Sequence, residues 1–233
     1  MTNAICLVTG SSRGIGAAVA RAFARDGMRV VLHGRDDAAL ARVKAEIAAE
    51  GGRALALRAD LTRFAEIEAL RQTVENEWGP IDILVANAGG SFTPPGPLEE
   101  ITEDGWRASV EGNLTATFLT IKSVLPGMKA RRAGAIITMS SAAARRPHPQ
   151  SPVPYAAAKA GIQMLTQHLA AQVGPFGIRV NCIAPETILT ERNIERIPEQ
   201  QKAALTADHP MRRLGTPDDV ARAARFLASG DAG

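Results

Sequence analysis

The sequence predicts an α/β protein with a doubly wound parallel sheet that is flanked by helices on both faces. Short apolar runs alternate with helical patterns along most of the chain, from residues 4–9 to residues 178–184. A glycine-rich turn follows the first apolar run directly. The 233 residues, of which 45% are hydrophobic, suit a single domain over residues 1–233 better than two domains.

The first apolar run, residues 4–9, is predicted to be a strand buried on both faces. Gly10, Gly14 and Gly16 follow it in the spacing G-x-x-x-G-x-G, and a helical pattern begins at Ala17. Glycines let a ligand approach the backbone, and the free N–H groups of a helix N-terminus attract an anion. The combination predicts a phosphate cradle of the Rossmann type, with an ordinary glycine-rich turn as the alternative.

The second predicted strand, residues 29–33, ends next to Arg35, where a dinucleotide fold holds the adenosine ribose. An acid at that place accepts from the ribose 2′-OH, whereas an arginine accommodates a 2′-phosphate. Asp36 comes one residue later and is predicted to cap the next helix, residues 38–50. Arg35, helped by Arg13 in the glycine turn, therefore predicts NADP(H) rather than NAD(H), and two solvated arginines are the alternative.

The same alternation continues to the end of the sheet. Further strands are expected at 54–59, 81–86, 135–139 and 178–184, and further helices at 65–78, 103–130, 155–173 and 218–228.

Ligands of such sheets lie along the carboxyl ends of the strands, so the residues that follow strands are site candidates. They include Asp60, Asn87 and Gly89, although turn chemistry alone also explains an asparagine after a strand. Asn113 falls inside the predicted helix 103–130, where asparagine is unfavourable. It is either a functional residue or a solvent-facing one.

Tyr155 and Lys159 stand at the start of a predicted helix, after a stiff loop, residues 145–154, with four prolines. Residues i and i+4 lie on the same helix face, so the phenol is expected beside the ammonium group. A neighbouring cation favours the phenolate, whose usual pKa is about 10, and such a pair could exchange protons near neutral pH. The alternative is a tyrosine packed in the core under the aliphatic part of the lysine.

These residues, in this order, make the chain resemble the short-chain dehydrogenase/reductase family over essentially its whole length. The matching positions are Thr9 to Gly16, Asp60, Asn87-Ala88-Gly89, Asn113, Ser141, Tyr155 and Lys159. Within that family the sequence is most similar to the β-ketoacyl-[acyl carrier protein] reductases and their sugar- and alcohol-dehydrogenase relatives. The resemblance implies an NADP(H)-dependent oxidoreductase that interconverts a ketone and a secondary alcohol, with a 3-oxoacyl thioester as the expected substrate. A sugar, polyol or other alcohol dehydrogenase and a non-catalytic NADP(H)-binding regulator are the alternatives.

The resemblance also implies roles for individual residues. Tyr155 is expected to be the general acid in reduction, or the base in oxidation, and Lys159 to lower its pKa and bind the nicotinamide ribose. Ser141 is expected to hydrogen-bond the substrate oxygen. Ser140 is the alternative, because Ser141 and Tyr155 are one residue further apart than relatives lead us to expect. Asn113 is expected to hold a water molecule in a proton relay.

Cofactor contacts are implied along the strand ends, and no metal site is expected. The implied positions are Gly10, Ser12, Arg13, Gly14, Ile15, Gly16, Arg35, Asp60, Leu61, Asn87, Ala88, Gly89, Tyr155, Lys159, Ile188 and Thr190. Asp60 and Asn87 are expected at the adenosine end of the cofactor. Glu186 stands where relatives usually carry glycine, and a carboxylate near the cofactor phosphates costs affinity unless it points away.

The last part of the chain carries three further expectations. Residues 187–215 are polar and weakly patterned, which predicts a mobile lid over the substrate. The family normally adds a strand after the helix predicted at 218–228, so we expect the final C-terminal strand to be missing here, as an absent tail rather than a truncated protein. Relatives commonly form homotetramers by packing helices equivalent to 103–130 and 155–173.

Composition narrows the choice of partners. The net charge is only +3 and the 27 Lys and Arg are scattered, which disfavours nucleic acid. Lys129, Arg131 and Arg132 form a basic patch that could meet an acidic acyl carrier protein or complement the helix dipole. Cys6 and Cys182 lie in apolar runs and are expected to be core thiols. Without a membrane-spanning run or a signal peptide, a cytoplasmic protein is expected.

Overall fold

The computed structural model describes residues 2–148 and 150–233. Six strands form one parallel sheet in the order β3-β2-β1-β4-β5-β6. They are β1 Ile5–Val8, β2 Arg29–Gly34, β3 Arg53–Arg58, β4 Ile83–Ala86, β5 Gly134–Met139 and β6 Ile178–Ile183. This order confirms the predicted doubly wound sheet. The strand order reverses between β1 and β4, which is where such sheets bind ligands.

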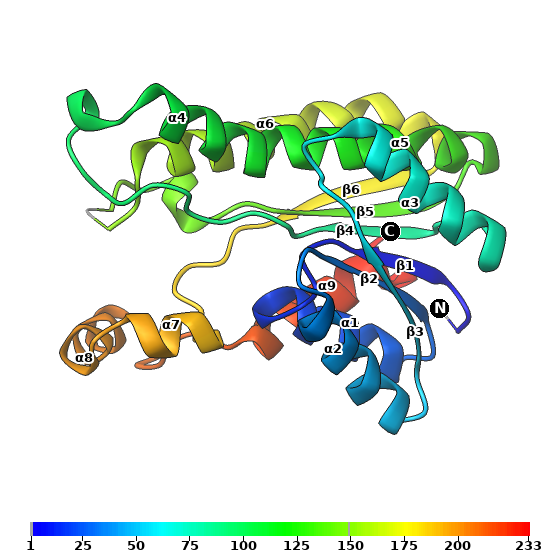
Figure 1. Ribbon diagram of the computed structural model, residues 1–233, viewed down its shortest axis with the longest axis horizontal. Helices are drawn as coiled ribbons and strands as arrows, with labels where there is room; N and C mark the ends of the chain where they lie inside the picture. The colour runs from blue at the N-terminus through cyan, green and yellow to red at the C-terminus, as the bar shows by residue number, and fades with distance from the viewer. Residues whose placement is uncertain (1, 149) are drawn as a thin grey trace.

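Helices cover both faces of the sheet (Figure 1). One face carries α1 Gly14–Arg25, α2 Asp37–Ala49 and α9 Pro217–Ala228, and the other carries α3 Phe64–Glu77, α4 Glu103–Val110, α5 Ala116–Arg131 and α6 Val153–Val173. The predicted lid contains α7 Glu191–Arg196 and α8 Glu199–Asp208, which lie apart from the sheet. Within the described residues, no helix is both long and apolar enough to cross a membrane.

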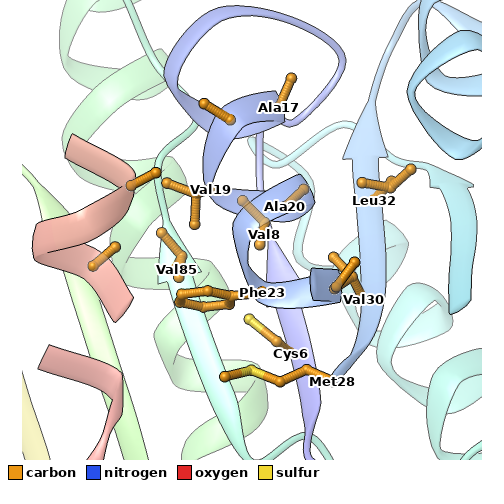
Figure 2. Packing of buried hydrophobic residues seen from close by; sticks show 14 of the residues in the cluster. Cys6, Val8, Ala17, Val19, Ala20, Phe23, Met28, Val30, Leu32 and Val85 are labelled. Atoms are coloured by element: carbon orange, nitrogen blue, oxygen red, sulfur yellow. The ribbon is translucent and has the colours of Figure 1, made fainter. Parts of the chain in front are cut away.

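The packing of α1 fixes the position of the glycine turn that precedes it. Val19 and Phe23, four residues apart, lie on the buried face of the helix. Phe23 is fully buried and lies over Cys6 and Val85 of the sheet (Figure 2). Removing such a ring, as in Phe23→Ala, typically costs about 3–5 kcal/mol.

The predicted single helix 103–130 is interrupted. Glu111–Thr115 forms a five-residue π-helical turn between α4 and α5. Asn113 lies in this turn and is fully buried, which excludes the solvent-facing alternative. Its Nδ2 donates to Ser109 O at 2.8 Å and to Gly90 O at 2.9 Å, and its Oδ1 accepts from Gly90 N at 3.0 Å. The side chain thus takes a carbonyl of the preceding helical turn, which is how an asparagine disturbs a helix.

Other boundaries differ from the predictions by a few residues. The helix expected to begin near Tyr155 begins at Val153, because Pro152 and Pro154 occupy its N-cap and first turn, where a backbone N–H is not needed. Pro149, part of the predicted proline-rich loop, lies outside the described residues. After α9 the described chain ends in a short 3-10 turn, Gly230–Ala232, with six strands in the sheet.

Candidate active site

The glycine turn between β1 and α1 is tightly enclosed. Gly10 has a φ of +65°, and a Cβ at this residue would lie 2.9 Å from the Cα of Ala88. A Cβ at Gly16 would lie 2.6 Å from Asn87 Nδ2. That amide donates to Thr9 O at 3.0 Å and Gly10 O at 3.2 Å. Asn87 therefore binds the turn that follows the neighbouring strand, β1. The alternative, that asparagine serves only the turn after its own strand, does not explain these contacts.

The N-terminus of α1 already holds an anionic group. The backbone N–H of Gly14 donates to Glu191 Oε2 at 3.1 Å, and Glu191 belongs to α7 in the predicted lid. Thr190 lies against the same turn, with its methyl carbon 3.2 Å from where a Cβ of Gly14 would be. A carboxylate bound at this place shows that the turn suits an anion, so the residues present fit the diphosphate of a dinucleotide.

The two arginines predicted to bind a 2′-phosphate, Arg13 and Arg35, differ in their ion pairing near the end of β2. Arg13 forms an ion pair with Asp36 at 3.0 Å. Asp36 also accepts from Ala39 N at 3.0 Å and so caps α2 as predicted. Both oxygens of this acid are engaged. Arg35 is exposed and makes no ion pair with any residue that the structure describes.

Asp60 follows β3 and is fixed to its own turn. Its Oδ1 accepts from the backbone N of Thr62 at 2.9 Å and from its hydroxyl at 2.8 Å. These hydrogen bonds lower the pKa of Asp60, so the residue is a carboxylate at the end of β3, where contact with the adenosine end of a cofactor stays a prediction. Leu61 is buried below it and packs with Ile67 and Ala116.

Three other predicted cofactor positions line the same edge of the sheet. Ser12 is buried against Gly34, and Ile15, at the start of α1, is partly buried against the core. Ile188 is buried and forms a β-bridge with Gly215, which joins the two ends of the predicted lid.

Tyr155 and Lys159 share one face of α6, as predicted, with the Lys159 nitrogen 5.7 Å from the centre of the Tyr155 ring. Lys159 is only 4% exposed, and its Nζ donates to Met139 O at 2.8 Å. Burial lowers the pKa of Lys159 to about 8. Burial also raises the pKa of Tyr155, and a hydrogen bond with the Ser141 hydroxyl opposes that rise. Burial is thus the larger influence on the phenol pKa in this structure, where Lys159 donates to a backbone carbonyl, and the expected effect of Lys159 on the phenol stays a prediction.

The two candidate serines have different partners. Ser140 Oγ donates to Lys159 O at 2.8 Å and accepts from Gln163 at 3.0 Å, so it fastens α6 to the end of β5. Ser141 instead faces the phenol of Tyr155. The longer loop before Tyr155 has not displaced Ser141 from the tyrosine.

Asn113 reaches the same corner from the π-helical turn. A Cβ at Gly89 would meet Asn113 Oδ1 and would lie 3.4 Å from Lys159 Nζ. Asn113 and Lys159 thus flank the turn after β4. The structure brings together all four residues for which catalytic roles were expected, at the carboxyl ends of β4 and β5.

A polar cavity of about 100 Å³ lies beside Ser141. Its walls include Ser141, Arg146, His148, Ser151, Glu186 and Thr187. Glu186 forms an ion pair with Arg146 across this cavity, so its carboxylate is engaged there and not at the glycine turn. Within the described residues, no cluster of three or more His, Cys, Asp or Glu could hold a metal ion.

The basic patch at the end of α5 is tied to its own surroundings. Arg131 donates to Ile81 O at 2.8 Å and Arg132 to Pro175 O at 2.6 Å. Lys129 and Arg132 also lie over the ring of Phe176, at 4.9 Å and 5.8 Å. These cations therefore have structural partners, and Arg131 and Arg132 remain at the surface.

Comparison with known proteins gives consistent matches over the whole chain. The family model described as enoyl-(acyl carrier protein) reductase matches residues 10–233. Glucose 1-dehydrogenase 2 of Bacillus subtilis (strain 168) is 37% identical over 100% of this chain and 90% of its own length. A 3-oxoacyl-[acyl-carrier-protein] reductase of Vibrio harveyi is 38% identical over 98% of this chain and 91% of its own.

A solved structure with a bound cofactor shares the fold of this chain. The 3-oxoacyl-[acyl-carrier protein] reductase of Brucella melitensis with bound NAD superposes with a TM-score of 0.91 at 35% identity, over 99% of this chain and 86% of its own. The sugar dehydrogenase and the acyl-carrier-protein reductases are equally similar to this chain, so similarity alone does not select a substrate.

Proposed function

The chain belongs to the short-chain dehydrogenase/reductase family of oxidoreductases, and we propose that it uses NADP(H) to interconvert a ketone and a secondary alcohol, with a 3-oxoacyl thioester as the first candidate substrate. One observation carries the proposal. Ser141, Tyr155 and Lys159 meet at the carboxyl end of β5, beside a glycine turn that holds an anionic group.

The proposed chemistry divides between cofactor and protein. Bound NADPH supplies the hydride. The Ser141 hydroxyl donates a hydrogen bond to the carbonyl oxygen, and the Tyr155 phenol donates a proton to it as negative charge develops. A raised pKa keeps the phenol protonated at neutral pH, which suits an acid. Lys159, still charged below its pKa of about 8, stabilises the phenolate that remains. Asn113, across Gly89 from Lys159, continues the path by which the proton is replaced.

Arg35 supports the choice of NADP(H), because it is exposed at the end of β2 while Asp36 is occupied by Arg13 and by the helix cap. Arg35→Ala is expected to weaken NADPH binding about 10- to 100-fold, as for loss of a charged hydrogen bond, and to leave NADH binding nearly unchanged. Arg42→Ala, an exposed arginine on α2, is the matched control. An equal loss for both cofactors would contradict the assignment.

A sugar or polyol is the second candidate substrate, because the cavity beside Ser141 is polar and contains the Arg146–Glu186 pair. The test follows nicotinamide absorbance with acetoacetyl thioester, glucose and cyclohexanone, for the wild type and for Glu186→Gly. Thioester turnover that survives Glu186→Gly supports the first candidate. Sugar turnover that this variant loses supports the second. If NADPH binds but no ketone or alcohol is turned over, the proposal that the chain is an enzyme is contradicted.

A homotetramer is proposed from the groove between α5 and α6. It has a volume of about 680 Å³ and is lined by Phe118, Ile121, Leu125, Leu165 and Leu169, among others. Phe118 is 46% exposed, and apolar surface of this kind favours a second copy of the chain. If the thioester is carried by an acyl carrier protein, we propose that it meets Lys129, Arg131 and Arg132. The two free thiols, Cys6 and Cys182, support a cytoplasmic location.

A further inference from the structure

His33 is a buried histidine that lies between two turns of the cofactor site. It is only 3% exposed. Its Nδ1 accepts a hydrogen bond from Gly10 N at 3.2 Å, and its Nε2 lies 3.0 Å from Ala59 O. Because Gly10 N can only donate and Ala59 O can only accept, the ring must be neutral with its proton on Nε2.

The ring joins strands that are not neighbours. β2 separates β1 from β3 in the sheet. At the end of β2, the backbone N–H of His33 donates to Ser11 Oγ at 2.9 Å, and the backbone N–H of Ser11 donates to the His33 carbonyl oxygen at 2.8 Å. The imidazole adds the third link, from Gly10 across to Ala59, next to Asp60.

We propose that His33 is a positioning residue of the cofactor site, whose neutral ring holds the Gly10 turn and the Asp60 turn at the separation that a dinucleotide needs. This inference rests on the proposed function, in that it requires the chain to bind a nicotinamide dinucleotide. His33 itself touches neither the substrate nor the reacting atoms in this account.

Protonation removes the link, because an imidazolium cannot accept from Gly10 N. Burial lowers the pKa of His33, Arg35 lowers it further, and the Ala59 carbonyl and Asp60 raise it. Among the described residues, Arg35 and Asp60 are the charged groups that shift the pKa of His33, and Arg13 of the glycine turn is paired with Asp36. The ring is therefore neutral at pH 7 to 8, and cofactor affinity should fall as the pH falls below the ordinary histidine range.

The test measures dissociation constants of NADPH and NADH by fluorescence from pH 8 down to about pH 4.5, which extends below the ordinary histidine range because the pKa of His33 is lowered, with circular dichroism at each pH to confirm folding. NADH is included because it lacks the 2′-phosphate, which itself titrates near pH 6. His33→Phe removes both hydrogen bonds, whereas His33→Gln can accept and donate but does not titrate. His168→Gln, in the groove between α5 and α6, is the matched control.

At pH 8, His33→Phe, which lacks both hydrogen bonds of the ring, should raise the dissociation constant of both cofactors about fivefold or more, since each hydrogen bond typically contributes about 1 kcal/mol, which corresponds to that factor. The effect should appear in KM for the cofactor, with kcat at saturating cofactor within about twofold of the wild type. His33→Gln should recover part of the affinity and show no dependence on pH, while the wild type and His168→Gln weaken together as the pH falls.

Two results would overturn the inference: a folded His33→Phe that binds as the wild type does, or a His33→Gln that keeps the wild-type pH dependence. If His33→Phe does not fold, His33→Gln decides alone. If neither cofactor binds the wild type at any pH, the proposed function fails instead.

Discussion

Burial shifts the pKa values of Tyr155 and Lys159 in opposite directions, because it disfavours the charged form of each. For tyrosine the charged form is the deprotonated one, and for lysine it is the protonated one. Burial raises the pKa of Tyr155 and lowers that of Lys159 to about 8. At neutral pH the phenol is therefore protonated and available as the acid, although its raised pKa makes it a weaker acid than a free phenol, and the lysine is close to its titration point. Reduction of a carbonyl should be favoured near neutral pH, and oxidation of an alcohol at higher pH, where the phenol must lose its proton.

Lys159 also makes stability depend on pH. Its folded pKa of about 8 lies below the ordinary 10.5, so the unfolded chain binds more protons between these values and stability rises with pH. We expect a gain of about 2 kcal/mol from pH 8 to pH 10, or several degrees in Tm. Lys159→Met should lack this gain and should be more stable than the wild type at pH 7. Thermal unfolding by circular dichroism at both pH values checks this, and equal pH profiles of the two proteins would contradict it.

The sequence supports some residue assignments better than others. Tyr155, Lys159 and Ser141 could be placed because each follows a strand or shares a helix face, which local patterns predict. The His33–Gly10 bond and the Glu191–Gly14 bond, the latter between residues 177 positions apart, depend on how strands and lid are arranged. No local pattern indicates such pairs. The burial that raises the Tyr155 pKa depends on the same tertiary arrangement, so local patterns do not predict it.

At the scale of elements, α7 contacts the glycine turn through Glu191, whose carboxylate occupies Gly14 N. A bound diphosphate would need the same N–H group and would be repelled by the acid. Glu191→Gln should therefore bind NADPH about 3- to 10-fold more tightly, within the range for charged hydrogen bonds and helix termini.

The control for this prediction is Glu195→Gln, an exposed acid on the same helix without a contact to the turn. Both variants are titrated with NADPH at low and high salt. Glu191→Gln should differ most from the wild type at low salt, since screening weakens the repulsion. Unchanged or weaker binding by Glu191→Gln, or equal gains in both variants, would contradict the account.

The helical elements show where periodicity is insufficient. The pattern over 103–130 predicts one helix, yet Asn113 opens a π-helical turn and places its amide on Gly90. Asparagine in a helix was the available signal, but it did not distinguish a buried role from an exposed one. α6 begins two residues before the predicted start at Tyr155, because Pro152 and Pro154 form the N-cap and first turn of the helix and do not belong only to the loop.

At the scale of the molecule, the alternation of apolar runs and helical patterns sufficed to predict the sheet, because parallel strands joined by helices allow few arrangements. Because all strands of this sheet are parallel, the polar residues that follow the strands lie along one edge of it. The substrate could not be predicted in this way, since it depends on loop side chains such as Arg146 and Glu186.

The groove between α5 and α6 gives a prediction about assembly. Phe118→Arg should prevent two copies from packing there, because it puts a charge into an apolar contact, and should yield a smaller particle in light scattering. Met211→Arg, at a side chain that is 75% exposed in the lid region, is the control and should keep the wild-type mass. A monomeric wild type, or a Phe118→Arg variant of unchanged mass, would contradict the proposed interface.

The most direct test of the account compares Tyr155→Phe with the wild type in NADPH-dependent carbonyl reduction. The proposal predicts that the variant binds NADPH almost as the wild type does but loses turnover at least about 100-fold, the usual contribution of a general acid. Turnover by Tyr155→Phe at the wild-type rate, with the same carbonyl substrate and saturating NADPH, would show that Tyr155 is not the acid.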